Sequence, residues 1–349
     1  MAQRPDEPPE SIILSGFAGV RNTVASERLG VRDLEAAVNV DLDDAGQLRR
    51  RRGQTLRMSG NFHSIQKVAR GVLGVRDGAL GWILPGYAFV SLGLDAGADA
   101  LLARQVDDVI YFGSRAVSGK IRSNDTIESW GVPASATTWL SPVIAPTDTA
   151  GAIAGKLISP PPMVGLFEMY RGRAYLADDK TLWVTELYLY DYVDRTKGFI
   201  QFEHTITQIA AVDDGLFVGT EGGIYFLKGS FAQGQRLSLL TQATALPGNY
   251  VTVPASKVHP NARQGVVPES DGVVFLTTDG ICVGFDGGQL FNLTQDRMVL
   301  PQARSAALLY RPLDGVNQVL AVADSGGSPT ASARIGDYVS AEIRRFQGG

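Results

Sequence analysis

The sequence comprises 349 residues with a net charge of −4 and an isoelectric point of about 5.5. Hydrophobic residues make up 44% and charged residues 19% of it, and this low charge excludes a disordered chain or a coiled coil. The acidic balance argues against a generally cationic nucleic-acid-binding protein but leaves room for a local basic patch. At about 150 residues per domain, the length predicts two domains or one large all-β domain.

Glycine and cysteine are the informative residue types. The 40 glycines are about 11% of the chain, against about 7% in an average protein, and with 17 prolines they are typical of short strands joined by tight turns. The single cysteine, Cys282, excludes an internal disulfide and a cysteine zinc site, and we expect it to be buried in a strand.

The N-terminal end is polar and rich in proline, and it lacks the apolar stretch of a signal peptide. No run approaches the roughly 20 apolar residues of a membrane-spanning helix. We therefore expect a soluble chain without a membrane anchor, made in the cytoplasm of its cell and either kept there or exported inside something larger.

Residues 1–53 form a distinct N-terminal region. We expect a flexible arm first, then a short helix within residues 26–40, although Gly30 interrupts it. The alternation around Val40 and Leu42, a turn at residues 43–46 and the return through Leu48 predict a hairpin that ends in a basic run.

A repeated β pattern follows over residues 54–330. Its clearest copy is a three-stranded meander at residues 273–294, whose first turn carries Asp279-Gly280, a strong hairpin signal because glycine adopts positive φ without steric cost. Similar strand–turn–strand copies recur along the chain, at residues 71–78, 109–115, 174–185, 216–227 and 306–323.

The turns of these copies give the spacing of the repeat. Their marker residues are separated by 35 to 64 positions and are Asp77, Arg115, Asp179, Glu221, Asp279 and Asp314. Repeats of about 40 to 50 residues with about four short strands each are typical of propeller blades. The sequence thus predicts an all-β fold, a β-propeller of roughly six blades with five or seven possible. A pair of two-sheet sandwiches is the alternative.

Two segments interrupt this pattern. Residues 135–162 are rich in Ala, Thr, Ser, Gly and Pro and predict a long loop between blades. After a Gly- and Ser-rich stretch, residues 331–349 predict a C-terminal closing segment, either a strand or a short helix.

Catalytic and cofactor signatures are missing from the sequence. The three histidines, His63, His204 and His259, have no metal-ligand spacing, and phosphate-binding, dinucleotide-binding and nucleophile-elbow motifs are absent. Paired carboxylates at residues 107–108, 178–179 and 213–214 are better explained as turn residues than as a glycosidase pair. We predict no catalytic residues, no cofactor and no metal.

One dense basic run stands out in the N-terminal region. Arg49, Arg50, Arg51 and Arg52 are consecutive, and guanidinium groups pair well with carboxylates or phosphates. A subunit interface and a plain solvated surface are equally supported, and contact with nucleic acid is the lesser alternative.

Several short stretches of the N-terminal region form a distinctive set: residues 16–22 (GFAGVRN), 27–29 (ERL), 36–41 (AAVNVD) and 46–53 (GQLRRRRG). Together they resemble the opening of bacteriophage tail proteins and, more loosely, podovirus tail nozzle and hub proteins. Later stretches agree with the resemblance: residues 160–162 (PPP), 170–175 (YRGRAY), 182–186 (LWVTE), 210–220 (AAVDDGLFVGT) and 337–339 (DYV).

The resemblance implies a structural role in the virion and carries no catalytic residue with it. It implies a tail nozzle, hub or baseplate protein in a ring-shaped homo-oligomer, in contact with other phage tail proteins and transiently with passing DNA. The alternative is a propeller that binds host-surface carbohydrate through Trp130, Trp139 or Trp183, although a strand tryptophan more often packs in the core. A propeller hydrolase would need a convergent acidic and basic pocket.

Overall fold

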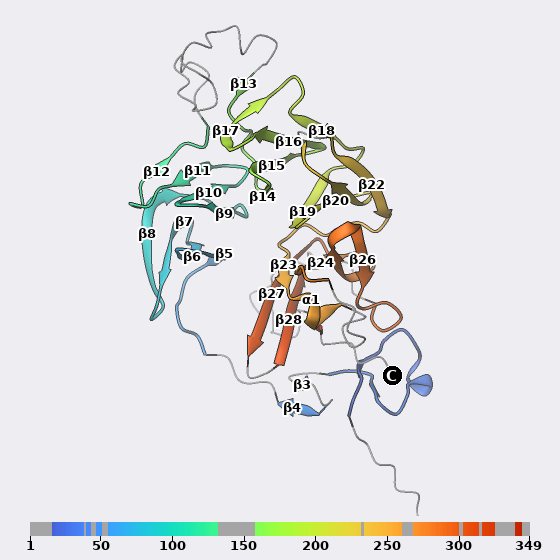
Figure 1. Ribbon diagram of the computed structural model, residues 1–349. Helices are drawn as coiled ribbons and strands as arrows, with labels where there is room; N and C mark the ends of the chain where they lie inside the picture. The colour runs from blue at the N-terminus through green and yellow to red at the C-terminus, as the bar shows by residue number, and fades with distance from the viewer. Residues whose placement is uncertain are drawn as a thin grey trace, which may run out of the picture.

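The computed structural model describes residues 16–37, 40–42, 47–50, 55–131, 158–231, 234–259, 268–299, 303–313, 316–324 and 339–343. Most of these residues lie in β-strands or in the turns between them (Figure 1). The helices that the described residues contain in full are the single turn α1 (Ala255–Val258) and the 3-10 turns Ser26–Arg28 and Asp286–Gly288.

Six antiparallel sheets follow one another along the chain, each made of strands from one continuous segment. The first sheet is β5 (Phe62–Val68), β6 (Gly71–Arg76), β7 (Ala79–Leu84) and β8 (Ala88–Asp95). The second is β9 (Leu102–Val106), β10 (Val109–Gly113), β11 (Ser118–Ile121) and β12 (Ile127–Glu128). The third is β14 (Phe167–Tyr170), β15 (Arg173–Asp178), β16 (Thr181–Glu186) and β17 (Leu189–Asp194), extended by β13 (Ile158–Ser159) and β18 (Phe199–Gln201).

The later sheets repeat the same up-and-down order. The fourth is β19 (Ile206–Val212), β20 (Gly215–Thr220), β21 (Gly223–Lys228) and β22 (Arg236–Thr241). The fifth is β23 (Val251–Val253), β24 (Gly272–Thr277), β25 (Gly280–Phe285) and β26 (Gln289–Asn292). The sixth is β27 (Ser305–Leu313), β28 (Val316–Asp324) and β29 (Val339–Ile343), which confirms a strand rather than a helix in the closing segment.

The turn markers occupy equivalent places in this repeat. Asp77, Arg115, Asp179, Glu221 and Asp279 each lie between the second and third strands of the first to fifth sheets in turn. Asp77 and Asp179 adopt positive φ of 51° and 52°, which Asp tolerates better than most residues. The sixth marker, Asp314, lies outside the described residues.

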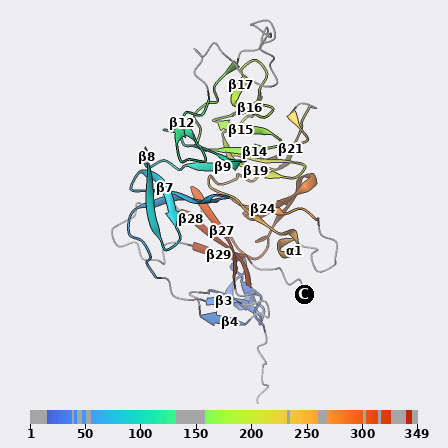
Figure 2. The same ribbon diagram turned by 60° about the vertical axis from the view of Figure 1, so that its left-hand side comes forward.

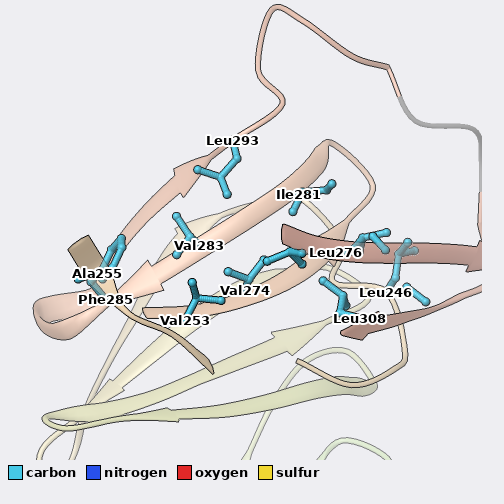
Figure 3. Packing of buried hydrophobic residues seen from close by; sticks show 13 residues of the cluster. Leu246, Val253, Ala255, Val274, Leu276, Ile281, Val283, Phe285, Leu293 and Leu308 are labelled. Atoms are coloured by element: carbon cyan, nitrogen blue, oxygen red, sulfur yellow. The ribbon is translucent and has the colours of Figure 1, made fainter. Parts of the chain in front are cut away.

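The core lies between consecutive sheets. Five clusters of buried side chains join the first sheet to the second and so on to the sixth. In the last of them Val274, Leu276 and Val283 of the fifth sheet face Leu308 of the sixth (Figure 3). Cys282 is 4% exposed in β25, which confirms its expected burial.

The first strands of successive sheets also contact one another: β5 with β9, β9 with β14, β14 with β19, and β23 with β27. Figures 1 and 2 show the sheets arranged around these strands. Radial stacking of four-stranded meanders is the architecture of a β-propeller. The prediction of a propeller-like body of about six sheets is therefore confirmed, in preference to a pair of sandwiches.

The N-terminal region differs in part from expectation. The helix predicted within residues 26–40 is wrong: among the described residues of this range only Ser26–Arg28 forms a 3-10 turn, and β2 (Asp33–Leu34) then pairs in parallel with β1 (Gly19–Val20). Ala25, which precedes the turn, makes no side-chain cap, and capping normally stabilises a helix start. The hairpin is confirmed as β3 (Val40–Leu42) and β4 (Leu48–Arg50).

Two predicted segments lie largely outside the described residues. These are the N-terminal arm, before residue 16, and most of the predicted loop at 135–162, of which residues 158–162 are described.

Candidate functional site

The innermost strands bring three polar side chains from three sheets together. They are Arg104 of β9, Glu168 of β14 and Tyr250, which directly precedes β23, and we call them the central triad. Arg104 Nε donates to both carboxylate oxygens of Glu168 at 2.9 Å, and its Nη2 lies 2.8 Å from Oε2. The Tyr250 hydroxyl donates to the same Oε2 at 2.6 Å.

Glu168 is the buried member of the central triad, and Arg104 and Tyr250 are partly buried around it. The Glu168 side chain is 5% exposed and that of Arg104 is 26% exposed. Burial, and then the negative charge of Glu168, raise the pKa of Tyr250 well above its usual value. Burial alone would lower the pKa of Arg104, but the attraction of Glu168 outweighs it and that pKa is raised. Tyr250 and Arg104 are thus held protonated.

The Arg104 guanidinium also lies 5.5 Å from the centroid of the Tyr250 ring, within the range of a cation–π contact. Every member of the triad is therefore engaged by the other two. The arrangement fixes the second, third and fifth sheets relative to one another and leaves its carboxylate bonded to two donors.

A small open cavity of about 340 Å³ adjoins Arg104 between β5 and β9. Its charged lining groups are Lys67, Arg104 and Asp107. Gln105, which also lines it, is already bonded: it donates to the Asp107 carbonyl at 2.8 Å and accepts from the Arg70 amide at 3.1 Å. The cavity thus offers a polar wall with charges of both signs.

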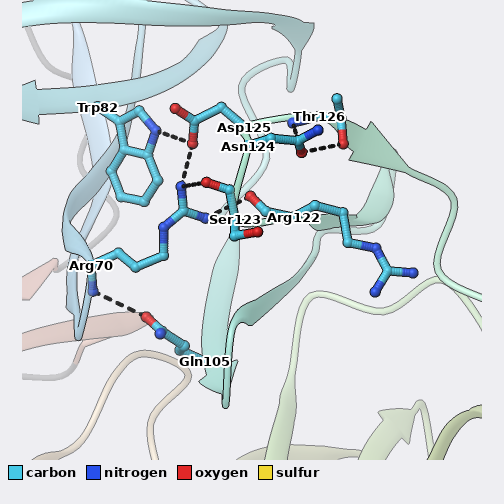
Figure 4. A network of polar contacts seen from close by, with 8 residues as sticks. All are labelled: Arg70, Trp82, Gln105, Arg122, Ser123, Asn124, Asp125 and Thr126. Atoms are coloured by element: carbon cyan, nitrogen blue, oxygen red, sulfur yellow. Dashed lines mark hydrogen bonds and ion pairs between the residues drawn. The ribbon is translucent and has the colours of Figure 1, made fainter.

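Beside this cavity, Arg70 joins the first two sheets at the surface (Figure 4). Its guanidinium donates to the carbonyl of Arg122 at 2.7 Å and to Asp125 at 2.5 Å. The same Asp125 oxygen accepts from the Trp82 indole at 3.1 Å, and the guanidinium lies 5.2 Å from the centre of that ring. These contacts couple one sheet to the next.

The N-terminal residues are held against the loop that connects the fifth and sixth sheets. Asn22 pairs through both atoms of its amide with the backbone of Val299, at 3.0 and 2.7 Å. Arg297 forms an ion pair with Asp33 at 2.9 Å, and Arg21 lies 3.5 Å from the same carboxylate. We call residues 16–35 with these contacts the N-terminal latch.

The arginines singled out in the sequence lie apart from the central triad. Arg49 and Arg50 are exposed on β4, in the hairpin with β3, whereas Arg51 and Arg52 lie outside the described residues. The structure therefore leaves Arg49 and Arg50 at a surface, where an interface would require them.

The three tryptophans proposed as carbohydrate-binding platforms do not share one environment. Trp130 is 5% exposed, packs between the second and third sheets and donates to the Tyr190 carbonyl at 2.9 Å. Trp183 is half-buried, and the Arg195 guanidinium lies 4.3 Å from the centre of its ring. Trp139 lies outside the described residues. Trp130 is thus a core residue, and Arg195 covers the ring of Trp183.

The remaining titratable residues of interest lie in separate places. His63 bonds Ser64 and the Gly97 carbonyl, while His259 packs between Phe285 and Phe291. The three aspartate pairs each lie at the junction of two strands, as expected for turn residues. No group of three or more metal-ligating side chains gathers within the described residues. None of the described helices has the length and apolar character needed to cross a membrane.

Sequence reasoning missed the central triad. Glu168 is a charge inside the apolar stretch at residues 166–170, and Arg104 interrupts another strand in the same way. A charged residue within a buried strand is rarely left unpaired, so this signal could have identified both residues. Their pairing could not be predicted, because 64 residues separate them along the chain.

Comparison with known proteins gives only distant likenesses. No family model and no curated protein matches the sequence. Among solved structures, the extracellular domain of BT4673 from B. thetaiotaomicron is 13% identical with a TM-score of 0.44, over 75% of this chain and 30% of that one. Kluyveromyces lactis Hsv2 is 10% identical with a TM-score of 0.41, over 79% and 81%. BBS1N, in complex with ARL6DN, is 11% identical with a TM-score of 0.42, over 74% and 73%.

This chain therefore spans about a third of the BT4673 domain and most of Hsv2 and BBS1N. Because every one of these TM-scores lies below 0.5, the fold assignment rests on the stacking of the six sheets, and these proteins lend no function to this one.

Proposed function

We propose that this chain is a non-catalytic structural component of a bacteriophage tail, as a nozzle, hub or baseplate protein. The observation that carries the proposal is the N-terminal latch. The residues that resemble the opening of phage tail proteins include Arg21 and Asn22. The Asn22 side chain binds the loop before the sixth sheet, and Arg21 pairs with Asp33, the carboxylate that also holds Arg297 of that loop. The N-terminal region that carries the resemblance thus has a structural role in this fold.

The central triad supports the same proposal. Its carboxylate is bonded by both Arg104 and Tyr250, and both partners are held protonated. A general base needs a pKa near the working pH and an open path to its substrate. A buried, fully paired carboxylate instead specifies how three sheets pack.

The proposed partners are other tail proteins and further copies of this chain, in a ring within the virion. The exposed Arg49 and Arg50 of the β3–β4 hairpin are the proposed contact for a neighbouring subunit. Arginine pairs with carboxylates in two-pronged geometry. If this hairpin lines a channel, the same guanidinium groups would contact the phosphates of passing DNA.

Quantitative mass spectrometry of purified virions tests the proposal. We expect the chain to be present at a few copies per particle, in a fixed ratio to the portal protein. Particles disrupted into heads and tails should retain it with the tails. Its absence from washed particles, with portal and capsid proteins present as internal controls, would contradict the proposal.

A further inference from the structure

The two terminal sheets bury only one of their faces. In the described residues, each sheet from the second to the fifth contributes to two of the five core clusters, whereas the first and the sixth contribute to one each. The faces turned away from the core still carry apolar side chains. We call them the first outer face (Phe62, Ile65, Val72, Ile83 and Phe89) and the sixth outer face (Ala307, Leu309, Leu320 and Val322).

Strand register places the residues of the first outer face together. Val72 pairs with Ile83, and Ile83 pairs with Phe89, so the three side chains form a row across β6, β7 and β8. A Cβ built on Gly74 would lie 3.3 Å from Ile83 and 3.4 Å from Ile65, which puts Ile65 on the same face. Ile65 is 55% exposed.

At the other end of this face, the rings of Phe62 and Phe89 contact each other edge to face, with 6.1 Å between their centroids. The guanidinium of Arg76 lies 5.7 and 5.8 Å from the two ring centres. The first outer face is therefore a broad platform of aromatic and large aliphatic side chains.

The sixth outer face is smaller and aliphatic. Ala307 pairs with Val322 and Leu309 with Leu320, so all four side chains lie on one side of β27 and β28. Leu309 is 58% and Val322 39% exposed. Large leucine and valine side chains exposed next to each other on a sheet indicate a surface that is covered in the assembled protein.

We propose that the sixth outer face of one molecule packs against the first outer face of a second copy of this chain, head to tail. Such a contact continues the stacking order of the five existing interfaces, in which each sheet packs on the next one along the chain. It also places small aliphatic side chains against an aromatic platform. The inference rests on the proposed homo-oligomer and assigns its interface.

The two faces differ from each other, so the contact is heterologous. Contacts of this kind generate a ring when the rotation closes and a filament when it does not. With all six sheets in place, Ile65, Leu309 and Val322 remain exposed, and the other large side chains of the two faces are partly exposed. Both faces can therefore receive a second molecule.

Cysteine cross-linking tests this interface, because the native Cys282 is buried and gives no background. Two variants, Ile65→Cys and Leu309→Cys, are purified separately, mixed, and treated with a short bis-maleimide. A second pair of variants, Phe89→Cys and Val322→Cys, tests a different contact between the same two faces. We expect a covalent dimer in each mixture, at least about tenfold above the level that either variant gives alone.

Leu239→Cys is the matched control, since Leu239 is 51% exposed on β22 of the fourth sheet, away from both outer faces. Mixed with either partner, it should give no more dimer than single variants do. In sedimentation, Leu309→Asp should convert oligomer to monomer, and Leu239→Asp should not.

The double variant Ile65→Cys/Leu309→Cys identifies the competing arrangement. If it cross-links within one chain while the mixtures give no dimer, the first and sixth sheets close on each other and the proposal is overturned. Absence of a cross-linked dimer from both mixtures, together with a wild-type protein that sediments as a monomer, also overturns it. If the chain is present in virions but these cross-links do not form, the proposed interface is wrong and the proposed tail function is unaffected.

Discussion

At the scale of single residues, the central triad shows how a propeller-like body accommodates charge near its axis. Arg104 and Glu168 come from adjacent sheets and Tyr250 from the fifth, and Arg104 and Tyr250 both donate to the buried carboxylate of Glu168. A buried ion pair contributes more to a specific arrangement than to net stability, but removing one partner leaves an uncompensated charge.

Glu168→Gln is therefore expected to destabilise the protein, because the half-buried Arg104 guanidinium would lose its countercharge. We expect a loss of about 3 kcal/mol in the free energy of unfolding, measured by urea denaturation. The matched control is Glu203→Gln at an exposed position, which should change stability by less than about 0.5 kcal/mol. Equal effects of the two substitutions would contradict the role given to the triad.

Cys282 is expected to be unreactive in the folded protein. Burial raises the pKa of its thiol to about 11, so the thiolate that reacts with disulfide reagents is scarce near neutral pH. The native protein should react with Ellman's reagent at least about a hundredfold more slowly than the urea-unfolded protein, which should release one equivalent per chain. Rapid labelling of the native protein would show that β25 is open to solvent.

Buried tyrosines are expected to make the free energy of unfolding depend on pH in alkaline solution. Burial raises the pKa of Tyr175 to about 12, whereas an unfolded tyrosine ionises near pH 10. Because the unfolded state loses its proton first, stability should be complete below about pH 10 and should fall as the pH rises toward 12. Tyr175→Phe should flatten this decline in urea-denaturation measurements across the range, and an unchanged slope would contradict it.

At the scale of elements, turns were the most predictable features. Short turns between apolar strands indicated the second and third strands of five sheets, and in four of them the turn contains Asp or Gly, because turn chemistry is local. The helix predicted after Ser26 failed for the opposite reason. Asn22 and Asp33 on either side of it bind Val299 and Arg297, some 270 residues away, and those contacts favour an extended chain.

The N-terminal latch is expected to open without unfolding the sheets. Asn22→Ala removes both side-chain bonds to Val299, and the backbone of residues 16–35 should become accessible. Trypsin should then cleave at Arg21, Arg28 or Arg32 about tenfold faster, with little change in the melting temperature. The control Arg236→Ala, on β22 of the fourth sheet, should leave the cleavage rate unchanged. An unchanged rate in Asn22→Ala would show that the latch does not depend on this residue.

At the scale of the whole molecule, the spacing of turns predicted the number of sheets because each sheet is a separate local unit. The sequence could not show which faces of the terminal sheets lack a neighbour, since Ile65 and Leu309 have the same alternation as residues buried between sheets. Side-chain pairs between strands that are distant in the sequence, such as Arg104 with Glu168, could not be predicted from the sequence pattern either.

The central claim is that this chain builds a ring in a phage tail, and cryo-electron microscopy of intact virions tests it most directly. The account predicts six-sheet bodies arranged around the tail axis, with the sixth sheet of each copy packed on the first sheet of the next. A tail map that contains no such propeller-like ring, from particles whose portal and capsid are resolved, would contradict it.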